Sequence, residues 1–144
     1  MFLPLKDINP TRHRPVATYT LIAANVAVFI YQLSLGSRLG NAFVASYGAV
    51  PFEITRMTDL VGQAKAGLPI VHYPGPHPIF LTLLTSMFLH GGFAHLGGNM
   101  LFLWIFGNNV EDILGPVRFV LFYLACGLAA HALHIASNPS SPVP

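Results

Sequence analysis

Charge is the first thing that this sequence lacks. Only 8% of its 144 residues are Asp, Glu, Lys or Arg, whereas 53% are hydrophobic; an ordinary soluble domain carries about 25% charged residues. The net charge of +2 comes from few side chains, and no basic patch with interleaved aromatic residues occurs. This composition argues against nucleic-acid binding and indicates one small membrane domain.

Cysteine is almost absent as well. Cys126 is the single cysteine, so an internal disulfide is excluded, and a lone cysteine in an apolar helix is most simply a small packing residue. The N-terminal stretch MFLPLKDINPTRHRP also lacks the basic start, apolar core and small-residue cleavage site that are typical of a signal peptide.

Long uncharged runs predict an all-α fold, a polytopic membrane helix bundle with three transmembrane helices. The first span is predicted over residues 16–35, which carry no charge and have the length of about 20 residues that a bilayer requires. Asn25 is its one strongly polar member and is expected to face another helix and hydrogen-bond there. The third span is predicted over residues 117–136, with Pro116 suited to the start of that helix.

Residues 79–106 are almost wholly apolar and too long for one ordinary span. The glycines in HGG at 90–92 weaken a helix, which favours an interfacial or re-entrant segment followed by a second span over 93–113. A single long tilted helix is the alternative. Residues 108–116 are interpreted as a short acidic turn into which the second span frays.

The other segments are predicted to be a cytoplasmic tail at 1–15, a long outside loop at 36–92 and a final loop at 137–144. In the long loop, PFEITRMTDLVGQAKAG favours a short helix that Pro51 opens and Gly67 closes. Three basic residues lie in the tail and none follows the third span, which predicts a cytoplasmic N-terminus.

The stretch FLHGGFAHLGGNM places three strongly polar side chains in the most apolar part of the chain. His95 and Asn99 are i and i+4 neighbours on one helix face, and His90 precedes them across two glycines. Polar groups at membrane depth are costly and therefore suggest a function. They could stabilise an oxyanion, bind a metal or only join helices; composition alone favours the last. The spacing of the histidines is not one of helical metal ligands, and no cofactor is predicted.

Other polar residues in and beside the apolar segments are interpreted without a catalytic role. Two histidines of the third span are expected to be solvated or hydrogen-bonded, and two in the Pro-rich loop to be exposed; these are His131 and His134, and His72 and His77. Three serines lack a neighbouring glycine and are rejected as nucleophiles, namely Ser86, Ser140 and Ser141.

The segment LTSMFLHGGFAHLGGNMLFLWIFGNNVEDILG resembles the signature region of the rhomboid intramembrane serine proteases. The match consists of H-x4-H-x3-N and two later residues, and it is close through residues 79–139; the matching residues are His90, His95, Asn99, Glu111 and Gly115. The resemblance implies a rhomboid-like fold and an endopeptidase that cleaves transmembrane proteins. His95 and Asn99 would then supply oxyanion-hole donors, His90 would lie close by, and Glu111 would be a structural hydrogen-bonding residue at the cytoplasmic end.

The sequence differs from the family pattern in two places. Phe80 stands where the family often has Trp, and no G-x-S-G element, which carries the family's nucleophile, occurs in the 144 residues. The chain is therefore expected to be the N-terminal part of a rhomboid protease and inactive by itself. Its expected partners are transmembrane-helix substrates, the lipid bilayer of a bacterial inner membrane and a missing C-terminal half. The alternatives are a non-catalytic rhomboid-like pseudoprotease that binds single-span client helices and, less favoured, a His-rich metal transporter.

Overall fold

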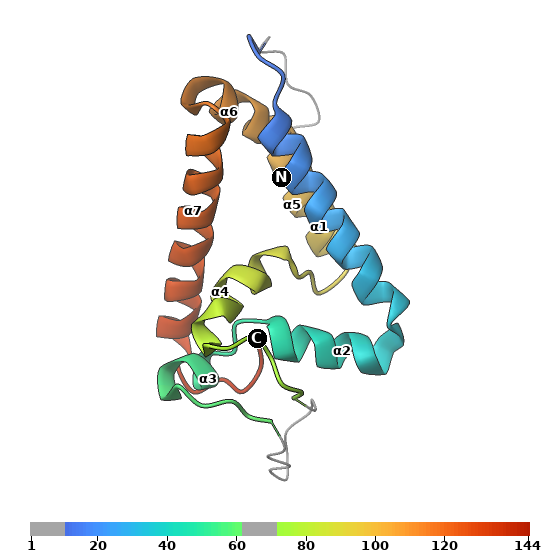
Figure 1. The fold of residues 1–144 in the computed structure, drawn as a ribbon, viewed down its shortest axis with the longest axis vertical. Helices are drawn as coiled ribbons and strands as arrows, with labels where there is room; N and C mark the ends of the chain where they lie inside the picture. The colour runs from blue at the N-terminus through green and yellow to red at the C-terminus, as the bar shows by residue number, and fades with distance from the viewer. Residues whose placement is uncertain (1–10, 62–71) are drawn as a thin grey trace. The chain divides into compact units, whose positions relative to one another are not determined.

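The computed structural model describes residues 11–61 and 72–144. Helices joined by turns make up these ranges, in which no strand occurs, and this confirms the predicted all-helical membrane class (Figure 1). Within the described ranges, two helices are long and apolar enough to cross a membrane, and a bent helix pair would be a third. Gly67, the predicted end of the loop helix, lies outside the described residues.

The chain forms two compact units. The first contains Met1–Phe29 and His90–Ala125, and the second contains Ile30–Leu89 and Cys126–Pro144. Helices α1 (Val16–Ser34) and α7 (Pro116–Ser137) each contribute residues to both units.

In the first unit, α1 has one buried face. Its buried residues recur every one to four positions and line one side of the helix: Ala17, Thr18, Leu21, Asn25 and Phe29. The amide nitrogen of Asn25 donates to the carbonyl oxygen of Leu21 in the same helix, at 2.7 Å. Its amide oxygen has no partner among the described residues. The expected burial of Asn25 is therefore found, but the expected hydrogen bond to another helix is not.

The second helical run of this unit is continuous but not uniform. It consists of α5 (Phe93–Phe102), a π-helical turn η3 (Leu103–Gly107) and α6 (Asn108–Leu114). Residues 108–114 are helical, so the acidic turn expected at 108–116 is wrong. The run ends at Gly115, whose φ of 78° lies in the left-handed region that glycine adopts without a steric penalty.

Gly107, the last residue of the π-helical turn, lies very close to Thr18 of α1. A Cβ atom at Gly107 would lie 3.1 Å from Cγ2 of Thr18, so only glycine permits this approach without displacement of the neighbour. The amide nitrogen of Asn109 donates to the carbonyl oxygen of Ile105 at 3.2 Å. Ile105 lies in the π-helical turn, where the regular i to i−4 backbone hydrogen bonds of an α-helix are interrupted, and the Asn109 side chain gives its carbonyl oxygen a hydrogen bond.

The carboxylate of Glu111 lies at the start of α1. It accepts hydrogen bonds from the backbone N–H groups of Ala17 and Thr18, at 2.9 and 2.7 Å, and from Oγ1 of Thr18 at 2.8 Å. The first N–H groups of a helix have no partner within the helix, and the helix dipole favours an anion there. Glu111, only 4% exposed, therefore caps α1 from a segment some ninety residues away in sequence.

The second unit contains two helices of the long loop. A helix not anticipated from the sequence, α2 (Gly36–Tyr47), follows α1 directly; its two glycines, Gly36 and Gly40, weaken the helical signal. Helix α3 (Pro51–Arg56) opens at Pro51 as predicted. It closes at Met57, whose φ is 49°, so the predicted closure at Gly67 is wrong.

The apolar stretch before α5 is also helical in short pieces. These are η1 (Ile79–Leu81), α4 (Thr82–Thr85) and η2 (Ser86–Phe88). Residues 89–92 are not helical, so the predicted interruption at HGG is confirmed and a single long helix is excluded. In the second unit, the side chain of Met87 packs where Gly127 of α7 carries no Cβ atom.

The final residues of the chain pack on α3. The backbone N–H of Phe52 donates to the carbonyl oxygen of Ser141, and Oγ1 of Thr55 donates to that of Pro139, both at 3.0 Å. The loop and the segment after α7 are thus joined within the second unit.

Replacement of Glu111 by alanine is expected to destabilise the protein by about 3 kcal/mol, because the substitution leaves buried N–H groups without an acceptor. Denaturant-induced unfolding of the intact protein in detergent measures this loss. Asp112→Ala is the control, since among the described residues the Asp112 carboxylate accepts from Arg12 and His13, both of which are exposed; it should cost less than about 1 kcal/mol. Equal losses in the two variants would contradict the cap.

Candidate functional site

The three sequence-predicted site residues come together in the first unit. The amide nitrogen of Asn99 lies 3.2 Å from Nε2 of His90, and the rings of His90 and His95 lie 5.1 Å apart between centroids. Asn99 and His95 share one face of α5, and the non-helical residues 89–92 allow His90 to reach the same place. The structure therefore brings the three predicted residues together.

The hydrogen bonds within the cluster favour particular proton positions. The backbone N–H of Gly91 approaches Nδ1 of His95 at 3.5 Å, a long bond in which Nδ1 is the acceptor. The neutral His95 ring then carries its proton on Nε2, which is left to donate elsewhere. The Asn99 amide nitrogen has a second hydrogen beyond the one it directs at His90. The Nε2–H of His95 and the second amide hydrogen of Asn99 are therefore two donors that the hydrogen bonds within the cluster do not use.

Burial divides the cluster into a buried and an exposed part. His90 is 2% exposed, whereas His95 and Asn99 are exposed. A Cβ atom at Gly97 or Gly98 would meet nothing within 4 Å, so this face of α5 is open in the described structure. Two exposed donors supported by a buried imidazole suit the binding of an oxygen atom that carries negative charge.

A serine–histidine pair that sequence reasoning did not anticipate lies in the second unit. Oγ of Ser86 is 2.9 Å from Nε2 of His131, and it also lies 3.3 Å from the carbonyl oxygen of Leu83. The residues are 45 positions apart, so no local spacing could reveal the contact. The expectation that His131 is hydrogen-bonded is thus met, and the bond ties α7 to the apolar segment before α5.

The long loop contains a buried histidine–glutamate pair. Nδ1 of His72 lies 3.2 Å from Oε1 of Glu53, and both side chains are almost fully buried. The expectation that His72 is exposed is therefore wrong, because the loop folds back on α3 and on the final residues, where His72 Nε2 lies 3.1 Å from the carbonyl oxygen of Pro142. His77 is exposed as expected, 3.8 Å from Asp59.

Burial raises the pKa of Glu53, because the charged carboxylate is poorly solvated inside the protein. The backbone N–H of Leu60, which donates to Oε1 at 2.9 Å, and the neighbouring His72 oppose this rise in pKa but do not cancel it. Glu53 gave no sequence signal of its burial, because an acidic residue near the start of a loop helix is ordinarily solvated.

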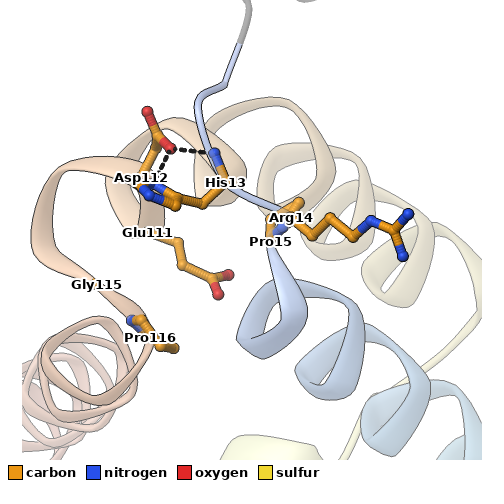
Figure 2. A pocket seen from close by; sticks show the side chains of 7 residues that line it. All are labelled: His13, Arg14, Pro15, Glu111, Asp112, Gly115 and Pro116. Atoms are coloured by element: carbon orange, nitrogen blue, oxygen red, sulfur yellow. Dashed lines mark hydrogen bonds and ion pairs between the residues drawn. The ribbon is translucent and has the colours of Figure 1, made fainter.

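A cavity of about 230 Å³ lies at the opposite end of the first unit (Figure 2). Figure 2 shows the Glu111 carboxylate directed at the first turn of α1 and Asp112 bonded to His13. The other residues that line it are Arg14, Pro15, Gly115 and Pro116. Asn99 is twelve positions before Glu111, roughly 18 Å along a helix, so this cavity is separate from the histidine–asparagine cluster.

Comparison with known proteins gives a consistent set of relatives. The Rhomboid domain matches residues 78–143. The chain is 31% identical over 131 residues to Rhomboid protease GluP of Bacillus subtilis, which covers 91% of this chain and 21% of GluP. It is 32% identical to RHOMBOID-like protein 4 of Arabidopsis thaliana, covering 83% of this chain and 33% of that protein.

The similarity extends to a rhomboid protein that is named as inactive. The chain is 23% identical over 100 residues to Inactive rhomboid protein 1 of Drosophila melanogaster, which covers 69% of this chain and 7% of that protein. The chain thus spans a third or less of the length of these relatives. No solved structure matches it.

Glu53→Gln is expected to change how the stability of the protein depends on pH. Since the pKa of Glu53 is raised in the folded state, its protonated form contributes stability that is fully present below its ordinary pKa of 4.5. That contribution is lost as the pH rises through the raised pKa. The glutamine of the variant does not ionise, so the Tm of the variant relative to the parent should increase as the pH rises above 4.5.

Thermal unfolding in detergent over a pH series measures this difference. Asp59→Asn is the comparison variant: the charge of Asp59 contributes to the raised pKa of Glu53, so this variant should show a change of the same sign but smaller than that of Glu53→Gln. Parallel Tm profiles for the parent and Glu53→Gln would contradict the raised pKa.

Proposed function

Because this chain belongs to the rhomboid family of membrane proteins, we propose that it supplies the oxyanion-binding half of an intramembrane serine endopeptidase that cleaves transmembrane proteins. The observation that carries the proposal is the pair of exposed donors, His95 and Asn99, on the open face of α5. The buried His90 ring contacts both members of this pair: its Nε2 is hydrogen-bonded to Asn99, and its ring lies edge-on to the ring of His95.

The chemistry follows from the donor positions. When a serine hydroxyl attacks the scissile carbonyl, negative charge develops on the carbonyl oxygen. The Nε2–H of His95 and the second amide hydrogen of Asn99 would donate to that oxygen. Donors fixed before the reaction stabilise the developing charge without reorganisation at that moment. The nucleophile and its base would come from residues of the whole protein outside these 144, since no G-x-S-G occurs among them.

The chain is an integral membrane protein. We further propose a cytoplasmic N-terminus in a bacterial inner membrane, supported by Lys6, Arg12 and Arg14 before α1. In this orientation the Glu111 end of the first unit faces the cytoplasm. The histidine–asparagine cluster, at the other end of the same helical run, faces the outside.

A second candidate function is the binding of single-span client helices without cleavage. It is favoured by the similarity to a rhomboid protein described as inactive. In that case the open face of α5 would contact a client helix. Cleavage of a transmembrane substrate by the intact protein separates the two functions.

His95→Ala and Asn99→Ala are each expected to lower the kcat of the intact protein for a transmembrane substrate by about 10²- to 10³-fold, the usual loss when one oxyanion donor is removed. Substrate cleavage by the purified protein in vesicles measures this loss. His134→Ala is a matched control, since His134 is an exposed histidine of α7. Unchanged cleavage by both site variants at normal expression would contradict the assignment of His95 and Asn99 as oxyanion donors.

Ser86→Ala is expected to leave cleavage unchanged, because the pairing of Ser86 with His131 is a structural bond between segments. The loss of that bond should lower the free energy of unfolding by about 1 kcal/mol. Cleavage and thermal unfolding are measured on the same preparation. A loss of cleavage without a loss of stability would instead identify Ser86 as a nucleophile.

A further inference from the structure

An aromatic side chain of the first membrane helix contacts the candidate site. Phe29 of α1 is 2% exposed, and its ring lies edge-to-face on the His90 ring, with centroids 6.4 Å apart and planes at 90°. It lies in the same manner on Phe93, at 5.2 Å and 83°. Phe29 therefore packs at the point where the non-helical residues 89–92 lead into α5.

His90 in turn restrains Asn99. An amide nitrogen can only donate, so the 3.2 Å contact requires Nε2 of His90 to accept the hydrogen bond. A neutral His90 ring then carries its proton on Nδ1. If the proton moved to Nε2, the Asn99 amide would have to turn so that its Oδ1 accepted the hydrogen bond, and its N–H groups would then point in other directions.

The second amide hydrogen of Asn99 depends on the same contact. With one hydrogen held by His90, the direction of the other is fixed relative to α5. Asn99 is exposed, and Gly98 beside it adds no side chain, so no other described group offers a comparable restraint. The orientation of the donor thus depends on the His90 ring, whose own orientation the edge-to-face contact with Phe29 helps to fix.

We propose that Phe29 is a positioning residue that acts through His90 to orient the Asn99 amide. This inference rests on the proposed function, in which Asn99 donates to the oxyanion. An edge-to-face contact holds a ring in one orientation as well as burying it, which an aliphatic side chain of similar size does not do. Phe29 touches neither the substrate nor the reacting atoms.

The test is Phe29→Leu in the intact protein, with kcat and KM measured separately on a transmembrane substrate. Misplacement of a catalytic donor by a fraction of an ångström should lower kcat by about 10- to 100-fold. KM should stay within about twofold, since ground-state binding does not use this donor. The side-chain amide resonances of Asn99 should shift in NMR spectra of the ¹⁵N-labelled protein.

Phe43→Leu is the matched control. Phe43 of α2 also makes two ring contacts, with Tyr31 at 5.4 Å and Tyr47 at 4.8 Å, but it belongs to the second unit. This variant should keep both kcat and the Asn99 resonances of the parent. A Phe29→Leu variant with the kcat of the parent and unmoved Asn99 resonances would overturn the inference.

The wild-type protein provides a measurement that does not depend on the variant folding. The ¹⁵N shifts of the His90 ring should show a neutral imidazole protonated on Nδ1. A ring protonated on Nε2 would overturn the inference.

The proposed function and this inference fail in different ways. Unchanged cleavage in His95→Ala and Asn99→Ala removes the proposed function, while the resonances still decide whether Phe29 orients Asn99. Reduced cleavage in those variants together with normal kcat in Phe29→Leu removes only the inference.

Discussion

The Glu111 carboxylate at the N-terminus of α1 is the contact on which the first unit depends. Three donors from α1 converge on it, namely the N–H groups of Ala17 and Thr18 and the Thr18 hydroxyl. In an apolar environment such donors have no water to bond, so a fixed anion removes a large desolvation penalty. The same contact sets the register of α1 against the run that begins at Phe93, with Gly107 allowing the close approach to Thr18.

The position of α1 against this run also determines which α1 side chain contacts the candidate site. At one end α1 is held by Glu111, and at the other Phe29 packs against His90 and Phe93. The helical run that carries the polar cluster thereby contacts α1 near both of its ends, at Phe93 and at Glu111, which suits donors that must be oriented before charge develops. The structure also explains why polar residues are tolerated in an apolar segment. His90 bonds Asn99 inside the unit, and the more exposed groups lie on its open face.

Much of this architecture was predictable, because uncharged runs and helix breakers are local signals. The long apolar helices, the opening of α3 at Pro51 and the interruption at HGG all follow from residue types at fixed spacing. Helix α2 gives no clear signal because its glycines and serines obscure the periodicity, and the polar residues 108–114 favour a turn by composition although they are helical. The i and i+4 spacing of His95 and Asn99 placed them on one face, but no spacing could show that His72 is buried against Glu53.

The sequence by itself determined the class of the protein and the residues that make up the candidate site, since both depend on composition and on short-range helical geometry. Tertiary structure alone decided which distant groups meet: Glu111 with the start of α1, Ser86 with His131, and Phe29 with His90. Each of these contacts joins segments at least 45 residues apart. The physical reason is that hydrogen bonds and ring contacts act over a few ångströms, so they form only after packing of the helices has brought such segments together.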